Sequence, residues 1–253
     1  MKMKKIVISL NCSERRKNFD RLFSFLEYKY FDAIVPADND PRFDQFIAKS
    51  LYSRELRKGE VGCTLSHAEI IKSFSESTDD SQWLLIMEDD ALPEPQFQKF
   101  IDDFSEECSK LSNTPQVILL GHSKTSKKHL FVQGLKQPLA NKIKIAGHIF
   151  GQNKYVTRCG TVCYLINKAA AITLSKPLKP YWLADEWSLY SNLGVVVHHP
   201  VKPLIYEDLS YASSTENEVT YQHDFIGRPL ANIVHILIGR YKYYNNMRKN
   251  RNE

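Results

Sequence analysis

The stretch WLLIMEDD, residues 83–90, joins an uninterrupted run of five apolar side chains to three consecutive acids. An apolar run this short predicts a β-strand that is buried on both faces rather than a helix. Strands of that kind belong to parallel sheets, in which ligands bind beyond the carboxyl ends of the strands. Because Glu88, Asp89 and Asp90 stand at that end, the stretch indicates both the fold class and the place of a site.

The segments on either side alternate between strand and helix patterns. We expect further strands at 5–10, 31–35, 117–120, 161–166 and 195–198, and helices over 13–26, 59–75, 93–111, 167–174, 187–193 and 229–244. Ser13 and Asn167 are expected to cap two of these helices. Segment 124–154 is broken by Gly134, Pro138 and Gly151 and is expected to form loops or an irregular hairpin. The alternation predicts an α/β fold with a doubly wound, mostly parallel sheet flanked by helices.

The composition is that of a folded, intracellular chain. With 253 residues, 43% of them hydrophobic, the protein can bury a full core. We find no signal-peptide pattern and no apolar run of the roughly 18–20 residues that span a bilayer, so we expect neither export nor membrane spanning. The five cysteines favour a reducing cytoplasm over a disulfide framework. Cys159 and Cys163 are expected to be small core residues, since no second pair accompanies them to complete a zinc site.

Positive charge is concentrated at the C-terminal end, although the net charge is only +5. Residues 225–252 contain no acid, and their six basic side chains are Arg228, Arg240, Lys242, Arg248, Lys249 and Arg251. Such a tail predicts an anionic surface as its neighbour. Tyrosines interleave with these basic residues, but no recognition module for nucleic acid occurs elsewhere, so we do not expect nucleic-acid binding.

Three adjacent carboxylates repel one another unless a cation or hydrogen-bond donors offset their charge. Oxygen ligands at a strand end suit Mn²⁺ or Mg²⁺, which can complete its shell from phosphate oxygens and water. The alternative is a solvated acidic turn that precedes the helix near Pro93, since acids are favoured at helix N-termini.

Two other segments contain chemistry-bearing residues. Residues 57–67, RKGEVGCTLSH, place two glycines before a helix, where a backbone can approach a ligand closely. The alternative is a loop and a helix start with a surface histidine. Residues 183–187, LADEW, set two acids beside an aromatic ring, as a sugar site does, although an ordinary helix N-terminus has the same composition.

Taken together and in this order, the segments resemble glycosyltransferase family 25, the lipooligosaccharide galactosyltransferase family that also includes the collagen galactosyltransferases. The matching residues are Ile8-Ser9-Leu10 with Arg15 and Arg16, Gly59-Glu60-Val61-Gly62-Cys63 with Ser66-His67, Glu88-Asp89-Asp90, Gly160-Thr161 and Asp185-Glu186. The resemblance covers roughly residues 4 to 206, and no pattern that we can match continues after about Tyr211.

This resemblance implies a GT-A-like fold and an inverting hexosyltransferase that uses a UDP-sugar, expected to be UDP-galactose. The acceptor is expected to be a lipid-linked saccharide of the lipooligosaccharide or lipopolysaccharide core, and the linkage β-1,4. We place a catalytic domain at 1–210, with a donor-binding half over 1–122 and an acceptor half over 123–210. Residues 211–253 would form a C-terminal helix and basic tail.

The resemblance also implies roles for single residues. Asp90 is expected to bind Mn²⁺ or Mg²⁺ directly, with Asp89 and Glu88 making ribose and outer contacts, and Asp185 is expected to be the general base, with Glu186 as the alternative. Ser9 and Leu10 should meet the uridine, Arg15 or Arg16 the nucleotide, and Gly160 and Thr161 the donor. His198 or His199 is a candidate further metal ligand, and its alternative is a structural role.

Two competing functions share some of these features. A metal-dependent phosphoesterase also uses clustered acids, but two-ion enzymes of that class need more ligands than one acidic cluster supplies. The other is a non-catalytic peripheral membrane protein that binds nucleotide sugars. For the transferase itself, the apolar positions of the terminal helix could lie on an anionic inner leaflet and hold the enzyme beside a lipid-linked acceptor, or they could pack on the catalytic domain. These positions are Leu230, Ile233, Val234, Leu237, Ile238 and Tyr241.

Overall fold

The structure is a computed structural model that describes residues 3–111, 113–122, 139–152, 160–176 and 179–210. Near the C-terminal end it also describes Leu237, Ile238, Arg240, Tyr241 and Tyr244, all of them helical. The rest of the predicted helix 229–244 lies outside the described residues, as do most of the tail, residues 123–138 and Cys159.

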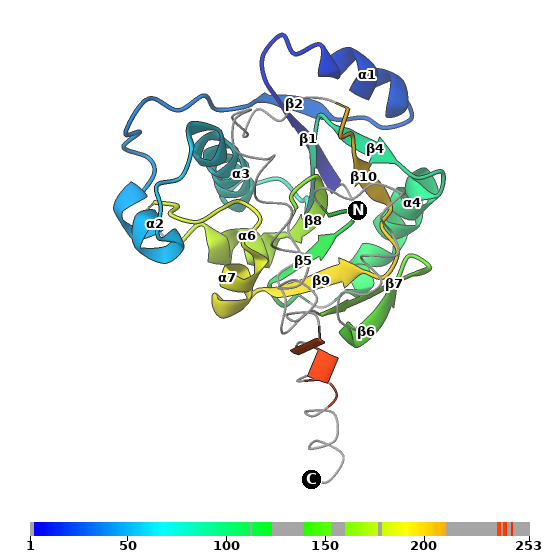
Figure 1. The fold of residues 1–253 in the computed structure, drawn as a ribbon. Coiled ribbons are helices and arrows are strands. Elements are labelled where there is room, and N and C mark those ends of the chain that lie inside the picture. The colour runs from blue at the N-terminus through cyan, green and yellow to red at the C-terminus, as the bar shows by residue number, and fades with distance from the viewer. Residues whose placement is uncertain are drawn as a thin grey trace.

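An eight-stranded sheet in the order β2-β1-β3-β8-β5-β9-β7-β6 forms the centre of the described part (Figure 1). The strands are β1 (Met3–Ser9), β2 (Lys29–Asp32), β3 (Trp83–Glu88), β5 (Gln116–Leu119), β6 (Ala140–Ile145), β7 (His148–Gln152), β8 (Cys163–Asn167) and β9 (Val196–Pro200). Only β8 and β7 run against the other six, so most strands point the same way. The predicted α/β fold with a mostly parallel sheet is confirmed.

Helices cover both faces of this sheet (Figure 1). On one face lie α1 (Arg15–Leu22) and α4 (Phe97–Glu107), the latter followed by a short 3-10 turn at Cys108–Lys110. On the other face lie α3 (Lys58–Glu76), α6 (Lys168–Leu174) and α7 (Trp187–Asn192). Helix α2 (Gln45–Tyr52) packs with the start of α3 in a smaller apolar cluster.

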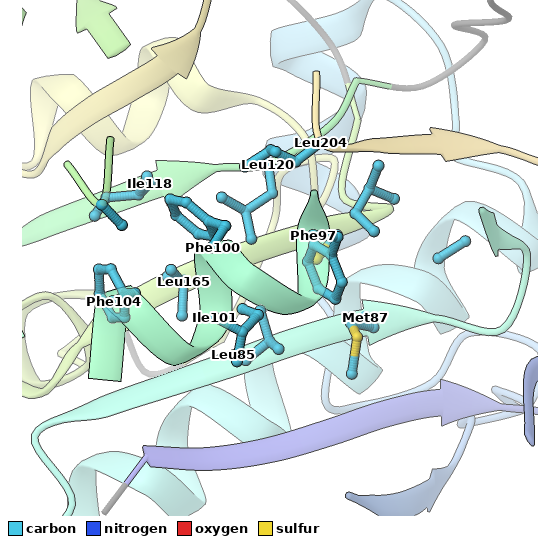
Figure 2. Close-up of a cluster of buried hydrophobic side chains, with 14 of the residues drawn as sticks. Leu85, Met87, Phe97, Phe100, Ile101, Phe104, Ile118, Leu120, Leu165 and Leu204 are labelled. Atoms are coloured by element: carbon cyan, nitrogen blue, oxygen red, sulfur yellow. The ribbon is translucent and has the colours of Figure 1, made fainter. Parts of the chain in front are cut away.

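Strand β3 is buried on both faces, as its apolar run predicts. Leu85 and Met87 join the core under α4, whereas Leu84 and Ile86 join the core under α3 and α6. Figure 2 shows the phenylalanine rings of α4 against the first of these faces. Each fully buried apolar side chain of this size contributes about 1.5–3 kcal/mol to stability. Since side chains alternate along a strand, Glu88 follows Leu84 and Ile86 toward the α3 side.

Several element boundaries differ from the sequence prediction. Helix α1 ends at Leu22 rather than Leu26, because Phe23 leaves the helix and stacks on Phe19 in the core. The centroids of the two rings are 4.2 Å apart. Glu14 occupies the N-cap position but makes no side-chain capping bond. The hydroxyl of Ser13 accepts from the amide of Arg15, the first residue of α1, at 3.2 Å, so Ser13 caps this helix as predicted. Asn167 caps α6 as predicted, with its side chain accepting from the amide of Ala170.

The segment after the acids also differs. Helix α4 begins at Phe97 rather than Pro93, because β4 (Ala91–Pro93) pairs antiparallel with β10 (Ile205–Glu207). These two strands and α2 were not predicted, whereas the hairpin predicted within 124–154 is present as β6 and β7. None of the helices in the described ranges is long and apolar enough to cross a membrane.

Helix α3 approaches the chain that follows β2 at Gly62. A methyl group there would lie 2.5 Å from the carbonyl oxygen of Ile34. Ser66 holds this contact, because its hydroxyl donates to the carbonyl of Gly62 at 2.7 Å and accepts from the amide of Ile34 at 2.9 Å. The absence of a side chain at Gly62 therefore lets α3, with Cys63 and His67, pack closely against the chain that follows β2.

We predict that Gly62→Ala lowers the free energy of unfolding by about 1–3 kcal/mol, because the added methyl group forces two backbones apart. The intrinsic preference of helices for alanine, about 1 kcal/mol, acts in the opposite direction and is outweighed. Urea denaturation measures the difference. Gly59→Ala, in the half-exposed first turn of the same helix, is the matched control and should be neutral or stabilising. A Gly62→Ala protein as stable as the wild type would contradict this packing.

Candidate active site

The three acids at the carboxyl end of β3 point to three different surroundings. The amide of Asp89 donates to the carbonyl of Ile8 on β1 at 3.1 Å, which extends the sheet by one residue. The Asp89 carboxylate accepts from the hydroxyls of Ser9 at 2.7 Å and Ser13 at 3.2 Å. Asp89 is therefore held against the loop between β1 and α1.

The two predicted arginines differ in what they contact. Arg16 donates to the hydroxyl of Ser9 at 3.1 Å and to its carbonyl at 3.2 Å, and it lies 4.5 Å over the ring of Tyr30. Arg15 instead reaches both Asp89 and Asp90, at 3.5 Å each. Arg16 thus supports Ser9, while Arg15 supplies positive charge to the acids. Leu10, the residue directly after β1, is 43% exposed.

Asp90 has an oxygen that is not hydrogen-bonded. Its backbone carbonyl accepts from the amide of Asp208 at 2.7 Å, but its buried Oδ1 has no hydrogen-bond partner among the described residues. Burial raises the pKa of Asp90 well above its usual range, and the negative charges of Glu88 and Glu207 raise it further. A buried carboxylate among like charges, with one oxygen unpaired, fits a bound cation.

Glu88 faces α3 instead of its neighbours in sequence. Its Oε1 accepts from the hydroxyl of Thr161 and lies 3.3 Å from Nε2 of His67. Burial alone would raise the pKa of Glu88, but the hydrogen bond and charge of His67, with the Thr161 hydroxyl, bring it below its ordinary value. The other ring nitrogen of His67 lies 2.8 Å from the hydroxyl of Tyr164 on β8. Cys63 stands one turn before His67 and is part of the same cluster.

Asp185 lies just before α7 and close enough to these acids to be affected by them. Burial, and then the charge of Glu88, raise the pKa of Asp185. Trp187 fixes this segment, since its indole N–H donates to the carbonyl of Gly160 at 3.2 Å. The carboxylate of Glu186 instead accepts from the hydroxyl of Ser188, an exposed residue of its own helix. Of the two acids, Asp185 is the one that the fold turns toward the cluster.

The structure does not bring His198 and His199 to the other predicted site residues. His198 of β9 pairs with Ile118 of β5. Across β8, Ile118 lies at the same level of the sheet as Leu85 of β3, which comes three residues before Glu88. Two strands separate β9 from β3, and at about 4.8 Å per strand spacing this is roughly 14 Å across the sheet. Burial lowers the pKa of His198 to about 4. The ring of His199 packs edge-on against His122.

Three residues near these acids had no role assigned from the sequence: Cys63 and His67 beside Glu88, and Glu207 near Asp90. Cys63 and His67 stand four residues apart in a predicted helix, and this spacing was the available signal that they share one face. Glu207 gave no such signal, because it lies on a three-residue strand just past the end of the family resemblance.

A family model places the chain among known proteins. The model of glycosyltransferase family 25, described as LPS biosynthesis protein, matches residues 2–188. The chain belongs to glycosyltransferase family 25. The matched range contains every predicted site residue except the two late histidines, which are also the residues that the fold holds away from the acids. The α/β fold, with its mostly parallel sheet flanked by helices, is the GT-A-like class expected for this family 25 protein.

Several solved structures are similar to this chain at low sequence identity. A crystal structure of a STIV protein is 17% identical, with 81% of this chain and 83% of that chain covered and a TM-score of 0.39. A glycosyltransferase involved in the glycosylation of the major capsid of PBCV-1 is 8% identical, with 83% and 94% covered and a TM-score of 0.38. Residues 1-349 of TarS from S. aureus are 14% identical, with 82% and 60% covered and a TM-score of 0.38. No curated protein matches this family 25 chain.

Proposed function

We propose that this protein transfers galactose from UDP-galactose to a saccharide acceptor with inversion at the anomeric carbon. The proposed product is a β-1,4 linkage in a lipooligosaccharide or lipopolysaccharide core. Family membership supports the class of glycosyltransferase. The observation that carries the proposal further is the buried Oδ1 of Asp90 at the carboxyl end of β3. This oxygen has no hydrogen-bond partner among the described residues, and the negative charges of Glu88 and Glu207 act on the carboxylate.

The donor-binding residues follow from the same geometry. Asp90 would hold Mn²⁺ or Mg²⁺, which when bound supplies positive charge against the charge that builds on the departing diphosphate. Arg15, already within 3.5 Å of Asp89 and Asp90, would add a second positive group on that side. Ser9 and Leu10, beside Asp89, would meet the nucleoside. Gly160 and Thr161 would border the donor from the opposite side of Glu88.

Asp185 is the proposed general base for the acceptor hydroxyl. A base must accept a proton near neutral pH, and its raised pKa moves this carboxylate toward that range. Its neighbour Trp187 is buried and fixes the segment, which gives the base a defined position. Glu186 is the weaker candidate, because the hydroxyl of Ser188 already engages its carboxylate.

We further propose that the basic tail attaches the enzyme to an anionic membrane surface, on the cytoplasmic side, where a lipid-linked acceptor would lie. Five basic residues, Arg240, Lys242, Arg248, Lys249 and Arg251, follow or border the apolar positions of the terminal segment. Of these apolar positions, Leu237 is 59% and Tyr241 68% exposed, which favours a free apolar face over packing on the catalytic domain.

The first prediction from the proposed function concerns Asp90. Asp90→Asn should lower the rate of galactose transfer by at least about 10²-fold, because the cation that it would hold contributes several kcal/mol to transition-state stabilisation. Transfer of radiolabelled galactose from UDP-galactose to a core saccharide, with and without Mn²⁺, measures this effect. Asp102→Asn, which removes an exposed acid of α4, is the control and should retain the wild-type rate. Full turnover by the wild type in excess chelator would refute the metal assignment.

The second prediction concerns Asp185. Asp185→Asn should lower kcat by about 10²–10⁴-fold and leave the affinity for UDP nearly unchanged, because a base acts in the transition state and not in donor binding. Glu186→Gln is the matched control, and a collapse of kcat in that variant alone would exchange the two roles.

Asp185→Asn should also change how the stability of the protein depends on pH. The folded protein raises the pKa of Asp185, so the ionised form is disfavoured on folding. Stability is therefore lost as pH rises from the unfolded pKa through the folded one. Asp185→Asn removes this loss, and urea denaturation should show it more stable than the wild type at neutral pH but not at acid pH. A variant that is less stable at neutral pH would argue against a strained, buried carboxylate.

The third prediction concerns the tail. The protein should co-sediment with anionic vesicles at low salt and be released at high salt, because counterions screen the attraction. Truncation after Ile226, or neutralisation of the five basic residues, should abolish sedimentation. Vesicles of neutral lipid are the control. Binding that persists after neutralisation would leave the apolar positions, rather than the charges, as the attachment.

A further inference from the structure

The cluster formed by α3 and the end of β3 contains a second set of metal-ligating atoms. Cys63 and His67 lie one turn apart on the face of α3 that meets Glu88. The sulfur of Cys63, a ring nitrogen of His67 and a carboxylate oxygen of Glu88 all lie within 4.8 Å of one another. We propose that these three side chains bind a zinc ion at a site separate from Asp90.

The separation between His67 and Glu88 suits a tetrahedral ion. Two ligands that each lie about 2.0–2.1 Å from zinc are about 3.3 Å apart when the shell is tetrahedral. Nε2 of His67 and Oε1 of Glu88 are 3.3 Å apart. This separation is long for an N–H···O hydrogen bond, whose usual length is about 2.9–3.0 Å. The pair is therefore spaced as two ligands of one ion would be.

Neighbouring groups orient the ligands. The hydroxyl of Tyr164, 2.8 Å from Nδ1 of His67, fixes the ring with Nε2 turned toward Glu88. The rings of His67 and Tyr164 also stack with their centroids 5.6 Å apart. On the other side, the hydroxyl of Thr161 donates to Glu88. Metal-binding histidines and carboxylates are held by partners of this kind.

The donor set distinguishes this site from the one at Asp90. Sulfur and imidazole ligands favour zinc, whereas carboxylate oxygens with water and phosphate suit Mn²⁺ or Mg²⁺. A thiolate and a carboxylate together balance the charge of a divalent ion, and the ion itself displaces the thiol proton on binding. Three protein ligands leave a fourth position for water. The ion would tie α3 to β3 and hold Glu88 away from Asp90.

The test measures metal in the full-length protein and does not depend on which sugar is transferred. Elemental analysis after equilibration with zinc should find one ion per chain that survives gel filtration. Replacement with Co²⁺ should produce the absorption of a thiolate-to-cobalt charge transfer. Cys63→Ser and His67→Ala should each weaken zinc binding by at least about 10²-fold, more than the loss of an orienting neighbour produces.

Two controls keep the outcome interpretable. Cys163→Ala removes another buried thiol, on β8, whose sulfur is not in the cluster, and it should retain both the zinc and the cobalt band. Asp90→Asn should also retain zinc, so a failed transferase and a failed zinc site remain distinguishable. Circular dichroism checks that each variant is folded. Absence of stoichiometric zinc from the wild type, or a cobalt band that Cys63→Ser leaves unchanged, would overturn the proposal.

Discussion

The burial of β3 on both faces determines where Glu88, Asp89 and Asp90 point. Because α4 covers one face and α3 with α6 the other, the strand has no freedom to rotate, and its side chains alternate strictly between two cores. Glu88, the last residue of the strand, must therefore face α3. Asp89 and Asp90 follow where the sheet ends and turn toward β1 and β10 instead. A sequence of three adjacent acids thus becomes three separate environments.

The repulsion among these acids is offset unequally. Asp89 has two hydroxyl donors and Arg15, and Glu88 has Thr161 and His67. Asp90 shares Arg15 at 3.5 Å but keeps a buried oxygen without a hydrogen bond among the described residues. Unpaired buried polar atoms are rare in folded proteins, because each loses its hydration without compensation. This imbalance at Asp90 is the observation that supports the proposed cation site at the carboxyl end of β3.

Features with a strong local signal were predictable from the sequence. The apolar run at 83–87 predicts β3, the helical spacing after Gly59 predicts α3, and Asn167 predicts the start of α6. Features set by distant pairing were not predictable. Strands β4 and β10 have three residues each and are defined only by one another, so Glu207 could not be placed beside Asp90. The distance of His198 from the acids depends on the register of three strand pairs, β3 with β8, β8 with β5 and β5 with β9, which no local pattern encodes.

The claim that Asp90 rather than Glu88 binds the Mn²⁺ of the donor site has a direct test. Mn²⁺ is titrated in the presence of UDP, and the electron paramagnetic resonance of the free ion is followed. We expect Asp90→Asn to weaken Mn²⁺ binding by at least about tenfold, as loss of a ligating carboxylate does. We expect Glu88→Gln to remain close to the wild type, because that side chain faces Cys63 and His67. Equal loss in the two variants, or unchanged binding in Asp90→Asn, would contradict the assignment of Asp90 as the metal-binding acid of this glycosyltransferase.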